Sequence, residues 1–180
     1  MDESGRPVRW RFSVRQAQGI NARSWPDGRV EVNAGTLGFV RNDHELAAVL
    51  AHEMAHVTGG HHRRQIAEGW INLLAGAALA TLLAHEGNDE ATALALAGGA
   101  VLTVHVTALA AQRRAREIEA DSLSLDLLRR AGYPALAAVE FWERYAVVRK
   151  AHGLASGRWW QSHPPDAERV RRLRELAAGR

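Results

Sequence analysis

The stretch HEMAHVTGGHH, residues 52–62, concentrates side chains that can bind a metal ion and activate water. Successive residues of an α-helix are rotated by about 100°, so His52 and His56 lie about 40° apart on one face. Two imidazoles placed this way can bind the same ion, and Glu53 lies beside them, within reach of a water molecule on the metal. The chemistry that this pattern predicts is metal-assisted hydrolysis with Glu53 as the general base.

The identity of a third ligand decides which class of metal site this is. A catalytic zinc site has three protein ligands and keeps one position for water. Within the stretch, His62 completes the pattern HExxHxxGxxH, the metzincin pattern, with Gly59 turning the chain. Metzincins also carry a methionine turn later in the chain. Here the two methionines, Met1 and Met54, both precede His62, so that support is missing.

A second pair of acidic residues, in the segment REIEAD, offers another completion. Glu117 and Asp121 are four residues apart, so they share one face of a helix. Glu117 can serve as a carboxylate ligand. Asp121, one turn later, can accept the N–H of a metal-binding imidazole and fix its orientation.

Four segments, in order along the chain, resemble the gluzincin peptidases of HtpX, BepA, Oma and the CAAX prenyl endopeptidase. They are INARSWPDGRVEVNAGTL (20–37), ELAAVLAHEMAHVTGGH (45–61), EIEAD (117–121) and SHPPDAERVRRL (162–173). The resemblance implies a zinc-dependent endopeptidase that cleaves polypeptide substrates and acts in protein quality control. It also implies that His52, His56 and Glu117 bind Zn²⁺, with Glu53 as the general base and Asp121 supporting a ligand.

The same resemblance assigns roles near the end of the chain. His163 falls where the family has a histidine near the metal, which either binds zinc at rest or stabilises the oxyanion. Arg169 matches the arginine that follows it. His61 matches an additional histidine that is not a ligand, and His62 has no role in the family.

The surrounding sequence predicts the elements that position these residues. Residues 8–33 read as short strands of an antiparallel meander, with a turn at Pro26–Gly28. From about residue 43 the chain reads as helical, with Asn42 and Glu45 at capping-box spacing and Gly59–Gly60 ending the first helix. An apolar helical hairpin is predicted over about 66–111, and a loop over 155–165. We therefore expect one zincin-like, mostly helical α+β domain over residues 1–180.

The composition limits the partners. The chain contains no cysteine, so a metal must be bound by histidine and carboxylate. The net charge is +3 with arginine clusters, but no nucleic-acid recognition motif accompanies them, so we expect no nucleic-acid partner. The segment 70–111 permits membrane association, although a buried or partly exposed hairpin is preferred. No signal peptide is visible, which predicts the cytoplasm for a native N-terminus and the cell envelope or periplasm for a trimmed chain.

Two further expectations concern substrate and activity. A polypeptide substrate is expected as an added strand beside residues 29–35, where main-chain hydrogen bonds would supply affinity. The alternative from another class is a zinc-stabilised, chaperone-like or binding module with little turnover, in which His163 occupies the open position on the metal.

Overall fold

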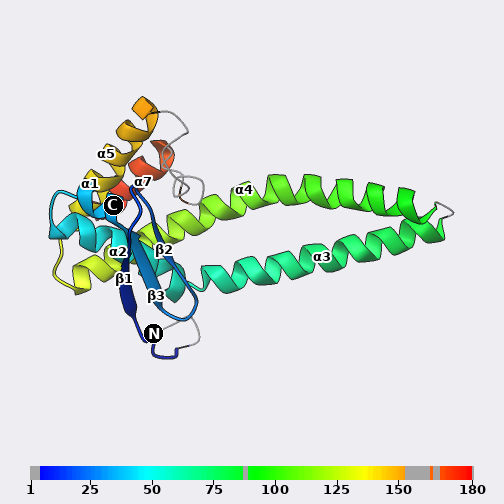
Figure 1. The fold of residues 1–180 in the computed structure, drawn as a ribbon, viewed down its shortest axis with the longest axis horizontal. Helices are drawn as coiled ribbons and strands as arrows, with labels where there is room; N and C mark the ends of the chain where they lie inside the picture. The colour runs from blue at the N-terminus through cyan, green and yellow to red at the C-terminus, as the bar shows by residue number, and fades with distance from the viewer. Residues whose placement is uncertain (1–4, 87–88, 153–162, 164–166, 180) are drawn as a thin grey trace. The chain divides into compact units, whose positions relative to one another are not determined.

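The computed structural model describes residues 5–86, 89–152, 163 and 167–179. A small sheet is followed by helices (Figure 1), in the order β1 (Arg11–Arg15), β2 (Ala22–Ser24), β3 (Arg29–Asn33), α1 (Ala34–Phe39), α2 (Asp43–Thr58), α3 (His61–His85), α4 (Glu90–Arg130), α5 (Leu136–His152) and α7 (Ala167–Ala177). This confirms the mostly helical α+β fold with an N-terminal sheet. The predicted loop over 155–165 lies outside the described residues, except for His163.

The chain divides into two compact units. One unit contains residues 1–61 and 115–180, and it holds the sheet and all of the predicted site residues. The other contains residues 62–114, which are most of α3 and the first part of α4. Because α4 is a single helix, the apolar segment 91–111 and the segment that carries Glu117 are continuous.

The predicted antiparallel meander is wrong in one strand pair. The turn at Pro26–Gly28 joins β2 and β3 as an antiparallel hairpin, as predicted, with Gly28 at φ +84°. However, β1 pairs with β3 in parallel, and the strand order is β1-β3-β2. The segment 16–21 must therefore cross the end of β3 to reach its other side.

This crossing segment is held by specific contacts. The side-chain amide of Asn33 donates to the Gly19 carbonyl at 2.9 Å, and the Asn21 N–H donates to Thr36 Oγ1 at 2.8 Å. A Cβ atom on Gly35 would lie 1.9 Å from the Gln18 carbonyl oxygen. A glycine at position 35 thus permits a close approach of backbones that the strand pattern alone does not reveal.

Helix α2 begins and ends where the sequence predicts. The Asn42 side chain accepts a hydrogen bond from the Glu45 N–H at 3.0 Å. The carboxylate of Glu45 does not complete the box on Asn42, because it accepts from the Arg41 N–H at 2.7 Å and from Arg144. Gly59 caps the other end, and Gly60 follows at φ +68°.

A hydrophobic core supports the face of α2 that carries the site. Phe141 and Trp142 of α5 are buried, with Leu125 of α4 and Leu173 of α7 beside them. The apolar stripe of α2, including Val49, packs into the same core. The site helix is thereby fixed by packing along its length.

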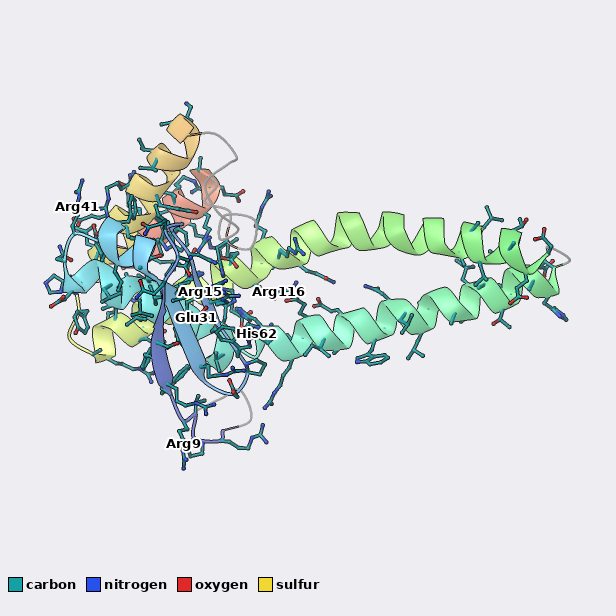
Figure 2. The ribbon with its side chains drawn as sticks, viewed as in Figure 1. Arg9, Arg15, Glu31, Arg41, His62 and Arg116 are labelled. Atoms are coloured by element: carbon teal, nitrogen blue, oxygen red, sulfur yellow. The ribbon has the colours of Figure 1, made fainter. Side chains whose placement is uncertain are left out.

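The unit 62–114 is a helical hairpin with exposed apolar side chains. Trp70, Ile71 and Leu74 of α3 are more than half exposed. Figure 2 draws the side chains on the ribbon as sticks. Among the described residues, α3 is the one helix long and apolar enough to cross a membrane by length and composition.

Candidate metal centre

Helix α2 presents three buried polar side chains on one face. His52, Glu53 and His56 are 0%, 1% and 7% exposed. The Nε2 atoms of His52 and His56 approach each other to 3.2 Å, as one helical turn allows. Two imidazole nitrogens aimed at one point are the arrangement that a shared cation requires.

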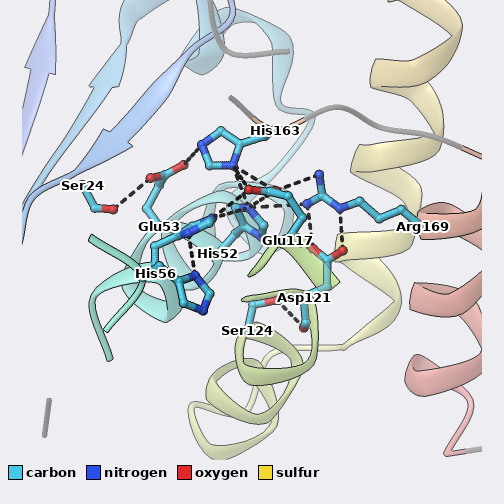
Figure 3. A network of polar contacts seen from close by, with 10 residues as sticks. Ser24, His52, Glu53, His56, Glu117, Asp121, Ser124, His163 and Arg169 are labelled. Atoms are coloured by element: carbon cyan, nitrogen blue, oxygen red, sulfur yellow. Dashed lines mark hydrogen bonds and ion pairs between the residues drawn. The ribbon is translucent and has the colours of Figure 1, made fainter. Parts of the chain in front are cut away.

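Glu117 of α4 completes a cluster with these histidines (Figure 3). Its carboxylate oxygens lie 3.3 Å from His52 Nε2 and 3.4 Å from His56 Nε2. The side chain is 3% exposed. Burial alone would raise the pKa of Glu117, but the charges of His163 and Arg169 and its hydrogen bonds hold that pKa well below 4.5. Glu117 is therefore an anion at neutral pH.

The spacing of these atoms fits a tetrahedral ion. Zinc bonds nitrogen and oxygen at about 2.0–2.2 Å, so neighbouring ligand atoms of a tetrahedral site are about 3.3–3.6 Å apart. The Nε2 atoms of His52 and His56 are 3.2 Å apart, and each lies near a different oxygen of the Glu117 carboxylate, at 3.3 Å from His52 and 3.4 Å from His56, close to this range. This donor set of two imidazoles and a carboxylate suits a catalytic zinc ion.

His163 lies against the same cluster. Its Nδ1 is 2.9 and 3.0 Å from the two Glu117 oxygens and 3.2 Å from His52 Nε2. One potential ligand atom from each of His52, His56, Glu117 and His163 lies within 4.8 Å of the others, and all four residues are buried. The Nε2 atom of His163 faces Glu53 at 3.6 Å.

Asp121 and Arg169 support the cluster from one side. Asp121 Oδ1 is 3.1 Å from His52 Nδ1, the nitrogen that does not face the cluster. Arg169 of α7 donates to both Asp121 oxygens, at 2.6 and 2.8 Å, and its Nη1 lies 3.0 Å from Glu117. Its guanidinium also covers the Trp142 ring at 4.1 Å. A bidentate pair of this kind fixes the Asp121 carboxylate in one orientation.

His52 and His56 differ in protonation. Burial alone would lower the pKa of His52, but hydrogen bonds to Asp121 and Glu117, with the Glu117 charge, raise that pKa to about 9. Burial lowers the pKa of His56 well below 6.5. His56 is therefore neutral at pH 7, with a lone pair available to a cation, whereas a cation at His52 must displace a proton.

His62, the third ligand of the metzincin alternative, and the two tyrosines of the chain lie outside this cluster. His62 is not part of the group of potential ligands found among the described residues, although it occupies the third-ligand position of the metzincin motif. Tyr145 packs in the core against Phe39 and Phe141, and Tyr133 packs against His44.

Sequence reasoning missed two contacts of the site. Ser24 of β2 donates from Oγ to Glu53 Oε2 at 3.1 Å. Trp142 of α5 packs edge-on against His52, with ring centroids 5.2 Å apart. Alternation along 22–24 places Ala22 and Ser24 on the same, buried face, which was the available signal for Ser24. Nothing in the local pattern of α5 distinguishes Trp142 from an ordinary core residue.

The substrate strand predicted beside residues 29–35 is contradicted by the sheet order. β3 is the central strand, so both of its edges are occupied, by β1 on one side and by β2 on the other. No added strand can pair there without displacing one of them.

Comparison with known proteins gives a family and several relatives. The profile of Peptidase family M48 matches residues 1–177. Metalloprotease YcaL of Escherichia coli is 28% identical over 98% of this chain and 65% of its own length. Metalloprotease LoiP of Escherichia coli is 29% identical over 96% of the chain and 64% of its length. The mitochondrial metalloendopeptidase OMA1 of Danio rerio is 30% identical over 94% of the chain and 36% of its own length.

These matches confirm the resemblance seen in the sequence motifs. The chain spans less than two thirds of the length of these relatives.

Proposed function

Because the chain belongs to peptidase family M48, we propose that it is a zinc-dependent endopeptidase whose ligands are His52, His56 and Glu117. The observation that carries the proposal is the convergence of these three buried side chains, with the His52 and His56 Nε2 atoms 3.2 Å apart and within 3.4 Å of the Glu117 carboxylate. A zinc ion bound there would supply Lewis acidity, which acidifies water and polarises the scissile carbonyl.

The protein's own groups perform the proton transfers. Glu53 accepts the proton of the attacking water and passes it to the leaving amine nitrogen. The Ser24 hydroxyl, which donates to Glu53 Oε2, leaves the other oxygen of that carboxylate for this task. Asp121 and Arg169 hold His52 and Glu117 in place.

His163 has two proposed roles that follow one another. In the described conformation its Nδ1 lies among the ligand atoms, which supports a resting state with His163 in the fourth position. A catalytic site needs that position for water or substrate. We propose that His163 leaves it when substrate binds and then stabilises the developing oxyanion.

Replacement of Glu53 by Gln tests the endopeptidase directly. The variant should bind zinc as the wild type does and lose about 10²–10⁴-fold in the rate of peptide hydrolysis, because the general base is gone. Casein digestion with and without a chelator, together with zinc content, measures both properties. A clean Glu53→Gln preparation with full activity would overturn the proposal.

The ligand assignment has a matched pair of variants. Glu117→Ala should lose zinc, since it removes a ligand, and His62→Ala should keep it. Zinc content after dialysis against a weak chelator distinguishes them. The reverse result would restore the metzincin arrangement.

The substrate is a polypeptide, which we propose binds along β2, an edge strand of the sheet in the part of the chain that the structure describes. This strand lies at the edge of the sheet, and its Ser24 side chain contacts Glu53. A peptide strand paired there would bring its backbone next to the general base. Peptides N-methylated at single backbone positions should show a raised KM at alternate positions. Equal cleavage of every methylated peptide would exclude strand addition.

The position of His163 also supports a second candidate, a zinc-stabilised binding module with little turnover. Activity of a His163→Ala variant separates the two. Measurable peptide hydrolysis by His163→Ala, even at a low rate, favours the peptidase. Zinc binding without hydrolysis in both the wild type and His163→Ala favours the module. Protein quality control is the biological role that we propose for the peptidase.

A further inference from the structure

We propose that His61 is a positioning residue for the metal centre, holding His56 in the tautomer that binds the ion, and that Glu119 holds His61. This inference rests on the proposed function, since it concerns the same site. It assigns a task to the GGH segment after His56, which neither the ligand set nor the general base uses.

The contact between the two histidines is direct and buried. His61 is 2% exposed, and its Nδ1 lies 2.8 Å from His56 Nδ1. On its other side, His61 Nε2 lies 3.4 Å from Glu119 Oε2. The Glu119 side chain is 43% exposed, so the row of three residues runs from the buried cluster toward solvent.

The positions of the protons follow from what each nitrogen faces. His56 Nε2 points at His52 and Glu117, so it must carry no proton when a cation binds. A neutral His56 then carries its proton on Nδ1, which donates to His61 Nδ1. His61 in turn carries its proton on Nε2, which faces the Glu119 carboxylate. The two Nδ1 atoms are then a matched donor and acceptor, and the contact of His61 Nε2 with Glu119 at 3.4 Å is electrostatic rather than a hydrogen bond.

Two glycines bring His61 back onto His56. Gly59 caps α2, and Gly60 turns the chain with a positive φ of +68°. A Cβ on Gly59 would lie 2.9 Å from His61 Nε2 and 3.0 Å from the Ala55 carbonyl oxygen. The absence of side chains at this turn therefore leaves the space that the His61 ring occupies.

His52 and His56 are supported by different chemistry. A carboxylate, Asp121, faces His52 Nδ1 directly, whereas the imidazole of His61 faces His56 Nδ1. Groups that hold metal-binding histidines orient the ring and raise its basicity, and their loss typically costs about 10–100-fold in metal affinity. Without His61, the His56 ring loses the acceptor for its Nδ1 proton.

The test is the Zn²⁺ affinity of metal-free protein, measured by competition with a chromophoric chelator. His61→Ala should weaken binding by about 10–100-fold. His61→Gln should restore most of the loss, because its carboxamide oxygen can accept the His56 N–H. Glu119→Gln should give a smaller loss. His62→Ala, at the adjacent position, is the matched control and should bind as the wild type does.

A second readout is the visible absorption of the Co²⁺-substituted proteins. We expect the bands of His61→Ala to shift and those of His61→Gln to return toward the wild type. Wild-type affinity and spectrum in His61→Ala would overturn the inference, as would equal losses in the Ala and Gln variants with unchanged folding. If circular dichroism shows that His61→Ala does not fold, the Zn²⁺ affinities of His61→Gln and Glu119→Gln decide whether the inference holds. A wild-type protein that binds no Zn²⁺ would instead refute the proposed function itself.

Discussion

Single residues at the centre are held from more than one side. Glu53 accepts from Ser24, and Asp121 pairs with Arg169. A side chain held this way keeps one orientation before substrate arrives, so less ordering is needed in the transition state. The polar groups of the site are therefore part of a connected network, shown in Figure 3.

Ser24→Ala should separate orientation of the general base from metal binding. We expect kcat to fall by about tenfold, consistent with loss of one hydrogen bond to a charged group. Zinc content should not change, because the Ser24 hydroxyl donates to the general base, Glu53, which is not a proposed ligand. Ser24→Thr keeps the hydroxyl and serves as the control. Equal kcat in Ser24→Ala and the wild type would show that the contact has no role in catalysis.

A second prediction concerns the buried pair of Glu45 and Arg144. Burial alone would raise the pKa of Glu45, but hydrogen bonds from Arg144 and the Arg41 N–H, with the Arg144 charge, hold it below 4.5. A carboxyl whose pKa is lower in the folded state than in the unfolded state stabilises the protein at pH values above its unfolded-state pKa. This stability is lost as the pH falls through the folded-state pKa.

Glu45→Gln should therefore lower the free energy of unfolding by about 2 kcal/mol at pH 7. The difference from the wild type should shrink as the pH falls below 4.5. Urea unfolding at several pH values measures it. A difference that stays constant with pH would contradict the assignment of this stability to the Glu45 charge.

Among the elements, the crossing segment 16–21 determines the topology of the sheet. It carries the chain over the end of β3, where the Gln18 carbonyl approaches Gly35. Gly38 lies in the same helix, α1, and a Cβ there would have no heavy atom within 4 Å. The two glycines thus have the same secondary structure and opposite surroundings.

Gly35→Ala should destabilise the protein by about 3 kcal/mol or more, since backbone must move to admit the methyl group. Gly38→Ala should be neutral or stabilising by up to about 1 kcal/mol, because alanine favours a helix. Thermal or urea unfolding compares them. Equal effects would show that segment 16–21 does not approach Gly35 as closely as described.

The difference between local and long-range patterns explains how much the sequence could predict. Asn42, Gly59 and the turn at Pro26–Gly28 act on near neighbours, so the limits of α2 and the β2–β3 hairpin could be predicted. The parallel pairing of β1 could not, because it depends on contacts made by residues 16–21 with α1.

The same distinction holds for the candidate site. The spacing of His52 and His56 is a property of one helix, and motif order along the chain pointed to Glu117 and His163. Ser24 and Trp142 reach the site only through tertiary packing. Their types and neighbours in the sequence are those of ordinary buried residues.

For the molecule as a whole, the unit 62–114 differs from the unit that holds the site. Its apolar side chains at Trp70, Ile71 and Leu74 are exposed in an α3 of bilayer-spanning length and composition. Large exposed apolar surfaces mark contacts with a protein or a membrane. We propose lipid as the partner of this hairpin, an association that the sequence permitted but did not favour.

Flotation with phospholipid vesicles tests this expectation. The wild type should float with the vesicles, and a variant with Trp70→Gln, Ile71→Gln and Leu74→Gln should remain in the aqueous fractions. Asn72→Ser, within the same helix, is the control. A wild-type protein that is monodisperse without detergent and does not float would exclude lipid as the partner of this surface.

The separation of the proposed ligands along the chain has a thermodynamic consequence. His52 and His163 are 111 residues apart, and the hairpin lies between them. An ion held by both would act as a cross-link that closes this long loop, and closing a long loop removes much of the entropy of the unfolded chain. Bound metal would also stabilise the folded state by mass action. Chelation should therefore expose the segment around α7 to proteolysis, so the ion would govern the lifetime of the protein as well as its chemistry.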